Sequence, residues 1–152
     1  MTVITADTLT LKRIQALFGE HDLPARIVEV APAAPELGLE QDAYLEVDYP
    51  NGQSVVIWPD TCVDHQLRMR VVVLTRQQIR EIDEADLLDW TAERNQQNEC
   101  YGTVCARNPL GVTVEYRLPY QSGVLDQTIL SAAEGLAKGA ALAQELKDFL
   151  LD

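Results

Sequence analysis

The side chains that could do acid–base or nucleophilic chemistry are few and scattered along the chain. His21 and His65 each stand beside an aspartate in loop-like sequence, which is typical of a solvated surface and defines no nucleophile–base pair. Nothing around Cys62 indicates the lowered pKa that a thiol nucleophile needs. Cys100 and Cys105 lack zinc-ribbon spacing, and no other Cys or His pair completes a site. GxSxG, P-loop, dinucleotide-binding and HExxH motifs are all absent, so we expect no enzyme.

A dense group of acids is the remaining candidate for metal chemistry. Its members are Glu81, Asp83, Glu84, Asp86 and Asp89. They fit no EF-hand order, and the entrance of a helix, where carboxylates stabilise the N-terminal end of the dipole, explains them more simply. The sequence therefore predicts neither a metal nor a cofactor.

Two arginines alternate with apolar residues in the expected strand at 67–74. On the solvent face, Arg68 and Arg70 could form a basic site for an anion, or they could pair across the sheet with Glu46 and Asp48. Opposite charges on neighbouring strands stabilise each other, so we favour the pairing with Glu46 and Asp48.

Two amides follow the apolar stripe of the middle helix. Leu87, Leu88 and Thr91 form its inward face, and Asn95 and Asn98 lie on the same side. Amides in such positions must find hydrogen bonds. We expect Asn95 and Asn98 to be structural, bracing a neighbouring loop or strand end, with catalysis as the alternative.

The elements that must position these groups follow from hydrophobic periodicity. A short first helix is expected between the cap Asp7 and the stop Gly19. A hairpin at 44–58 turns at Pro50-Asn51-Gly52, where Asn-Gly supplies positive φ angles. Asp83 is expected to cap a second helix, and a second hairpin spans 101–118.

The order of these elements predicts an α+β fold for a single domain over residues 1–152. Strands joined by hairpin-type turns, with helices between the runs, indicate an antiparallel sheet with helices packed on it. The expected order is roughly α-ββββ-α-ββ-α, and the last helix is the longest. The acidic, proline-containing segment 31–42 is expected to be a loop.

The final helix, expected from about Val124 to Leu151 after the turn at Gly123, would be roughly 40 Å long. One apolar stripe of this helix is expected to pack against the sheet. Beside it runs a second strip of small and apolar residues: Ser131, Gly135, Gly139, Leu142, Leu146 and Phe149. Glycine inside a helix costs about 1 kcal/mol relative to alanine, so close backbone approach is expected here. The neighbour is either a partner helix or the chain's own first helix.

The net charge of −12 on 152 residues restricts the partners. Nucleic acid and anionic membranes both require neutralisation by Lys and Arg, so we expect neither. The sequence shows no secretory signal and no stretch long enough to span a membrane. Three cysteines do not suit a disulfide scaffold, and we therefore expect a cytoplasmic location.

The run LLDWTAERNQQN at 87–98 resembles the YbjN family of bacterial sensory transduction regulators. The Asn-x-x-Asn of that family corresponds to Asn95 and Asn98. Its strand–turn–helix element corresponds to Leu118-Pro119 followed by Gly123-Val124. The resemblance covers most of the chain from Leu87 onward. The acidic, proline-containing loop 31–42 is a departure from the type III secretion chaperones whose fold is similar to that of the family.

The resemblance implies a fold similar to that of class I type III secretion chaperones. These are small, acidic, dimeric α+β proteins that hold extended segments of other proteins. The family has no established catalytic residues to carry over. Fold likeness alone does not prove function.

Three functional hypotheses follow. The first is a non-enzymatic regulator or chaperone-like adaptor that binds another protein, or itself as a homodimer, through the sheet and the C-terminal helix. Its candidate partner-binding residues are Gly135, Gly139, Leu142, Leu146 and Phe149. The second is a ligand- or ion-sensing module, or a weak enzyme, that uses the cleft near Asn95, Asn98 and Cys62. The third is a structural domain that associates only with itself.

Overall fold

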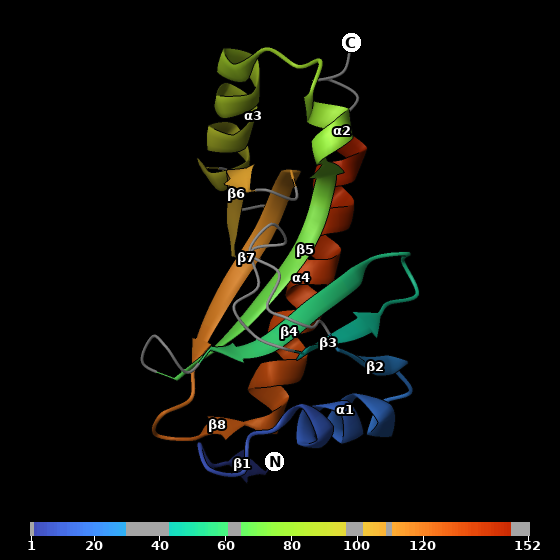
Figure 1. Ribbon diagram of the computed structural model, residues 1–152, viewed down its shortest axis with the longest axis vertical. Coiled ribbons are helices and arrows are strands. Elements are labelled where there is room, and N and C mark those ends of the chain that lie inside the picture. The colour runs from blue at the N-terminus through green and yellow to red at the C-terminus, as the bar shows by residue number, and fades with distance from the viewer. Residues whose placement is uncertain (1, 30–42, 61–64, 97–101, 109–110, 147–152) are drawn as a thin grey trace.

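The computed structural model describes residues 2–29, 43–60, 65–96, 102–108 and 111–146 (Figure 1). In chain order its elements are β1 (Val3–Ile4), α1 (Leu11–Glu20), β2 (Ala25–Glu29), β3 (Ala43–Asp48), β4 (Ser54–Asp60), β5 (Gln66–Thr75), α2 (Arg76–Ile79), α3 (Glu84–Gln96), β6 (Thr103–Asn108), β7 (Gly111–Pro119), β8 (Val124–Leu125) and α4 (Asp126–Leu146). The expected α+β class with a long C-terminal helix is confirmed.

Six strands form one antiparallel sheet in the order β2-β3-β4-β5-β7-β6. The helix α4 runs behind this sheet and packs mainly against β5 and β7, with further contacts to β4 and β8 (Figure 1). Helix α3 lies beyond one end of the sheet and packs against β6. Helix α1 lies near the other end, against β2 and β3.

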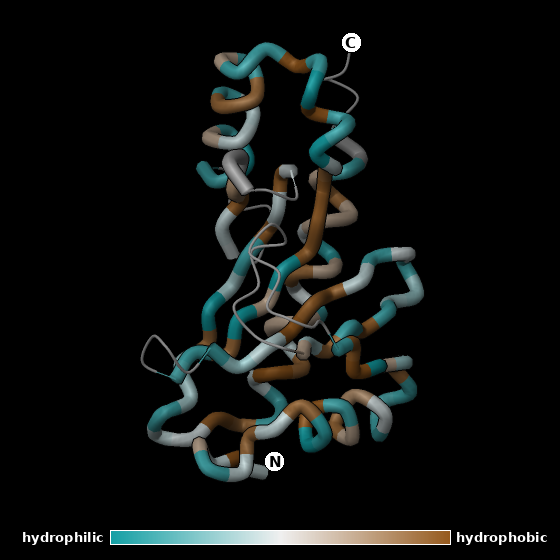
Figure 2. The backbone as a smooth tube through the Cα atoms, in the orientation of Figure 1, coloured by the Kyte–Doolittle hydropathy of each residue, from teal (hydrophilic) through white to brown (hydrophobic). Residues whose placement is uncertain are grey.

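The core lies between the sheet and α4. Alternate strand residues face the helix and are almost completely buried, among them Val47, Ile57 and Val114. Their partners on α4 include Leu136 and Ala140, both fully buried. Figure 2 shows the same hydrophobic bands on the central strands. Small alanines on the helix let it approach the sheet closely, so long aliphatic side chains on the strands fill the space between them.

The first helix begins later and ends later than the sequence predicted. Thr10, not Asp7, is its N-cap, and the Thr10 hydroxyl accepts a hydrogen bond from Arg13 N at 3.1 Å. The helix passes through Gly19 and ends at Glu20. Gly19 has no positive φ, so it does not form the left-handed C-cap that was expected of it.

The first hairpin turns through Pro50, Asn51 and Gly52, as predicted, but only one of these residues has a positive φ angle. Tyr49 N donates to Gln53 O at 2.9 Å, and Gly52 N donates to Tyr49 O at 3.0 Å. Gly52 has φ 88°, whereas Asn51 has no positive φ. A three-residue loop needs the left-handed conformation only at its last residue, and Gly52 supplies it.

The start of α4 is also corrected. The chain turns at Gly123, which has φ 93°, but Val124 and Leu125 then pair with Ile4 and Val3 as a two-stranded ribbon. The helix therefore begins at Asp126 and not at Val124, because strand β1 takes the residues between the turn and the helix.

The connection from β5 to α3 contains one short helix and two helix caps. Thr75 and Gln78 form a reciprocal capping box at the start of α2. Asp83 accepts a hydrogen bond from Ala85 N at 2.9 Å, as expected of the residue before α3. The predicted inward face of α3 is wrong at Leu88, which is 38% exposed, since Trp90 turns inward instead.

Candidate functional site

The sheet opens between its two central strands β4 and β5. Their pairing runs from Asp60 opposite Gln66 to Val56 opposite Arg70 and ends there among the described residues. Both strands continue beyond that point, β4 back to Ser54 and β5 on to Thr75. Figure 1 shows the strands diverging, with α4 behind the opening. We call the space between Ser54–Val56 and Arg70–Val73 the wedge.

The strand periodicity tells which backbone groups face the wedge. Tyr49 N bonds Gln53 O, so Gln53, and with it Val55, turns its backbone groups toward β3. Ser54 and Val56 must then face β5. Val56 pairs with Arg70, and the next pair in the same register would be Ser54 with Val72. Because the register stops first, the N–H and C=O groups of Ser54 and Val72 face the wedge.

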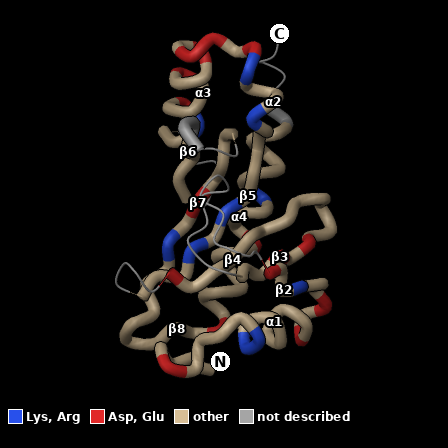
Figure 3. Tube along the Cα trace, in the orientation of Figure 1, with Lys and Arg blue, Asp and Glu red and all other residues tan. Residues whose placement is uncertain are grey.

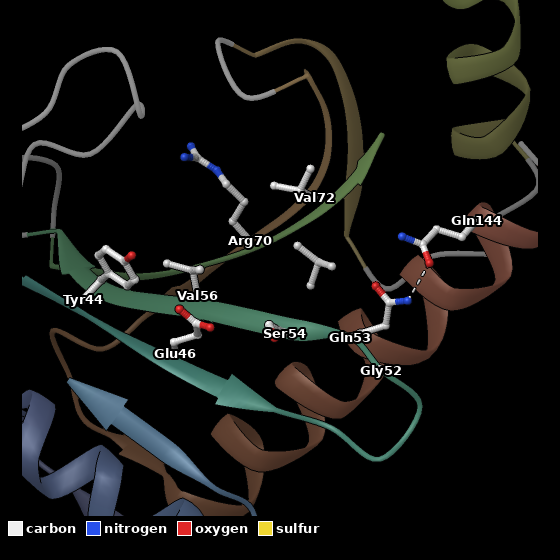
Figure 4. A pocket seen from close by; sticks show the side chains of 10 residues that line it. Tyr44, Glu46, Gly52, Gln53, Ser54, Val56, Arg70, Val72 and Gln144 are labelled. Atoms are coloured by element: carbon white, nitrogen blue, oxygen red, sulfur yellow. Dashed lines mark hydrogen bonds between the residues drawn. The ribbon is translucent and has the colours of Figure 1, made fainter. Parts of the chain in front are cut away.

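A cavity of about 410 Å³ occupies the wedge (Figure 4). This volume is within the range of ligand pockets. Its walls come from β3, β4, β5 and α4, and they combine apolar and polar side chains: Tyr44, Glu46, Gln53, Ser54, Val56, Arg70, Val71, Val72 and Gln144, together with Gly52.

A glutamine of α4 bridges the far end of the wedge. The Gln144 Oε1 accepts a hydrogen bond from Gln53 Nε2 at 2.8 Å, and its Nε2 donates to Val73 O at 3.3 Å. Seven residues earlier on the helix, about two turns, Ala137 O accepts from Asn51 Nδ2 at 3.2 Å. Helix α4 is therefore tied to the hairpin at two points, and it closes the wedge from behind.

A row of charged side chains crosses the sheet at the apex of the wedge. The register aligns Arg26, Glu46, Val56, Arg70 and Glu115 on adjacent strands. Arg26 bonds Glu46 at 2.8 Å, and Arg70 bonds Glu115 at 3.1 Å. Val56 is the uncharged position between these two pairs. Figure 3 shows basic residues gathered on β5 and β7.

The predicted pairing of Arg68 and Arg70 with Glu46 and Asp48 is therefore wrong. Glu115 is the shared partner of both arginines. Arg68 also forms a second ion pair, with Asp60 at 3.6 Å. The reason is the strand order, since β7 follows β5 directly in the sheet whereas β3 is separated from it by β4.

This face is also more buried than expected. Trp58 is 1% exposed, and the guanidinium carbons of Arg68 and Arg70 lie 5.2 Å and 5.0 Å from its ring centroid. Burial raises the pKa of Glu115, but the combined effect of Arg70, Thr113 and Arg68 lowers it by more than burial raises it. The net pKa is therefore below its ordinary value. The carboxylate is thus held in its charged form.

Asn95 lies at the opposite end of the sheet from β2 and braces the edge strand β6. Its Oδ1 accepts from Val104 N at 2.7 Å, and its Nδ2 donates to Val104 O at 3.0 Å. One side chain thus takes both backbone groups of Val104 and occupies the place of a further strand. Asn98 and Cys62, the other members of the predicted cleft, lie outside the described residues.

The predicted partner-binding strip on α4 is only partly described. Gly135 is half-buried, Gly139 is buried and Leu142 is 38% exposed. Phe149 lies outside the described residues, as does the side chain of Leu146. The main neighbours of α4 are strands, as expected of its main apolar stripe. The two alternatives for the second strip, a partner helix and the chain's own first helix, stay predictions.

The other predicted groups lie apart from the wedge. His21 lines a separate hollow of about 320 Å³ with Tyr49 and Glu134. His65 stacks edge-on against Tyr120 with 5.7 Å between ring centroids. Burial, followed by the neighbouring Glu115, raises the pKa of the Cys105 thiol, which opposes thiolate formation. Among the described residues, no cluster of His, Cys, Asp and Glu is suited to hold a metal.

The residues that define the wedge were not singled out by the sequence. Gln144 follows Ala143 on the buried side of the helix, and a polar residue beside an apolar stripe was the one available signal. Ser54 and Val72 carry no signal of their own, because their importance comes from a register that ends between two strands.

Comparison with models of known protein families found no match to this chain, and a search among curated proteins found none. No described helix is both long enough and apolar enough to cross a bilayer.

Proposed function

We propose that this protein is a non-enzymatic, cytoplasmic adaptor or chaperone-like regulator that binds another protein through its sheet and α4. The wedge is the observation that carries the proposal. Two strands of one sheet turn backbone hydrogen-bonding groups of Ser54 and Val72 toward a cavity that α4 closes from behind. Such groups are the usual means by which a sheet recognises another polypeptide.

The charge of the chain favours a basic partner. The net charge is −12, and Glu46 lines the cavity. A strongly acidic protein attracts basic partners over distances of about a Debye length, and it repels acidic ones. The resemblance to the YbjN family, and through it to chaperones that hold extended segments, agrees with this proposal.

Affinity purification from the native host, with mass spectrometry of the bound proteins, tests the proposal. Val56→Trp fills the apex of the wedge with a large side chain, and we expect it to remove a stoichiometric partner that the wild type retains. Val28→Trp is the matched control, because Val28 is also a half-buried valine on the face opposite α4, but it lies on β2, outside the wedge. Recovery of the protein alone, with no partner for the wild type, would contradict the proposal.

The proposal includes self-association as a homodimer through the strip on α4 that contains Leu142. Leu142→Asp should convert a dimer to a monomer in sedimentation velocity. Leu125→Asp provides the control, since Leu125 is 37% exposed and Leu142 is 38% exposed, but Leu125 precedes α4. Equal molecular masses for the two variants and the wild type would exclude this interface.

A further inference from the structure

We infer that the wedge takes an extended, basic segment of another polypeptide as an additional strand between β4 and β5. This inference rests on the proposed function and states the manner of binding. It differs from strand addition at the outer edges of the sheet, where Asn95 occupies Val104 on β6 and Gln15 Nε2 donates to Ala25 O on β2 at 3.0 Å.

The backbone groups in the wedge match those of an extended chain. In a strand, successive residues turn their N–H and C=O groups to opposite sides. One residue of an entering segment can therefore bond Ser54 on β4, and the next residue can bond Val72 on β5. Ser54 and Val72 would have bonded each other had the register continued. The entering segment takes the place of this one interrupted ladder, and because β4 and β5 are antiparallel it runs antiparallel to one of them and parallel to the other.

The side chain of Gln144 already holds the place of one peptide group. Its amide accepts a hydrogen bond from the β4 side, through Gln53, and donates one to Val73 O on β5. A primary amide has the same acceptor and donor as a peptide unit. The register of β5 with β7 is irregular between Val72 and Leu74, and at this irregularity Val73 O accepts from Gln144. The far end of the wedge is thus bridged by the donor and acceptor that a peptide unit also carries, and the segment competes with this amide for Val73 O.

The two faces of the wedge set the side chains that the segment can carry. On the side of α4, Val55 and Val71 are at most 2% exposed and Ala140 is fully buried, so the inward side chain must be small. On the opposite face, Glu46 lines the cavity and Arg70 is paired with Glu115. A lysine or arginine on that face gains from Glu46, which it shares with the exposed Arg26, and from the net charge of −12.

Amide hydrogen exchange with a synthetic probe tests the inference. The probe is a short capped peptide of alternating threonine and alanine with a lysine at each end, and its control carries the same sequence with N-methylated central amides. We expect the probe to slow exchange at Ser54 and Val72 by at least about tenfold, and the N-methylated peptide to leave it unchanged. Equal effects of both peptides, or no slowing by the probe, would overturn the inference.

Two variants make the result specific to the wedge. Val56→Trp should abolish the protection and Val28→Trp should retain it. Gln144→Leu removes the competitor for Val73 O, and the affinity for the probe should rise by about three- to tenfold. An unchanged or lower affinity would show that Gln144 does not compete with the segment for Val73 O, and would overturn that part of the inference.

The outcomes for the inference and for the proposed function are distinguishable. A host partner that is lost in Val56→Trp, together with no protection of Ser54 and Val72 by that purified partner, would retain protein binding and reject the inserted strand. Protection of both amides by the probe, without any host partner, would support the inserted strand and reject the cellular role.

Discussion

The edge at β6 and the wedge between β4 and β5 both have an amide side chain bonded to strand backbone, but only the edge is closed. Asn95 bonds the N–H and the C=O of the same residue, Val104, at 2.7 Å and 3.0 Å. Gln144 bonds one carbonyl, Val73 O, at the longer distance of 3.3 Å, and it shares its oxygen with Gln53.

The difference shows how side-chain reach decides whether a strand edge stays available. Asn95 is short and stands on α3, which packs against β6, so its amide is held in register with one residue. Gln144 is longer by one methylene and spans a gap, so more rotamer entropy is lost for each hydrogen bond it makes. A fixed two-point cap closes an edge, whereas a single long bond leaves neighbouring groups open.

The largest expected effect is at the closed edge. Asn95→Ala removes both hydrogen bonds and leaves the two Val104 groups without their partner, so we expect the free energy of unfolding to fall by about 2–4 kcal/mol. Urea denaturation measures this loss. A loss no larger than that of Gln144→Leu would break the comparison, because it would show that Asn95 stabilises its edge no more than Gln144 stabilises the wedge.

A smaller effect is expected at the charged row beside the wedge. Glu115→Gln weakens the contacts to Arg68 and Arg70, and should lower the free energy of unfolding by about 1–3 kcal/mol at neutral pH. Glu46→Gln is the control. Its partner Arg26 is 69% exposed in its side chain, so that change should cost at most about 1 kcal/mol.

The same pair of variants sharpens the comparison through pH. The folded-state pKa of Glu115 is lowered from 4.5, so its stabilising contribution is fully present above pH 4.5 and is lost as the pH falls through the lowered pKa. Wild-type stability should therefore fall more steeply than that of Glu115→Gln below pH 4.5. Parallel acid titrations, followed by urea denaturation at each pH, would refute this expectation.

The smallest effect is expected at the wedge itself. Gln144→Leu replaces the amide with a shorter apolar side chain and removes the long hydrogen bond to Val73 together with the bond to Gln53, and we expect the free energy of unfolding to change by less than about 1 kcal/mol. Thermal and urea denaturation measure this change. A loss as large as that at Asn95 would show that the wedge is held shut as firmly as the edge.

Local sequence predicted the elements of this protein well, because periodicity and turn chemistry act within a few residues. The alternation along 111–118 and the period of the final helix both appear in the structure as β7 and α4. Gly52 and Gly123 take the positive φ angles that their turns require. The predicted cap Asp7 was wrong because Thr10 stands directly before the helix and caps it. The predicted stop Gly19 was wrong because the helix continues to Glu20, and Asp22, with φ 58°, takes the left-handed conformation instead.

The sequence by itself thus determined the α+β class, the hairpins and the long C-terminal helix. Only the tertiary structure decided that Arg68 and Arg70 share Glu115, and that the register of β4 with β5 ends at Val56. The reason is physical. Periodicity assigns a residue to a face, but the partner on the next strand depends on strand order and on where two twisted strands part, and these follow from packing against α4.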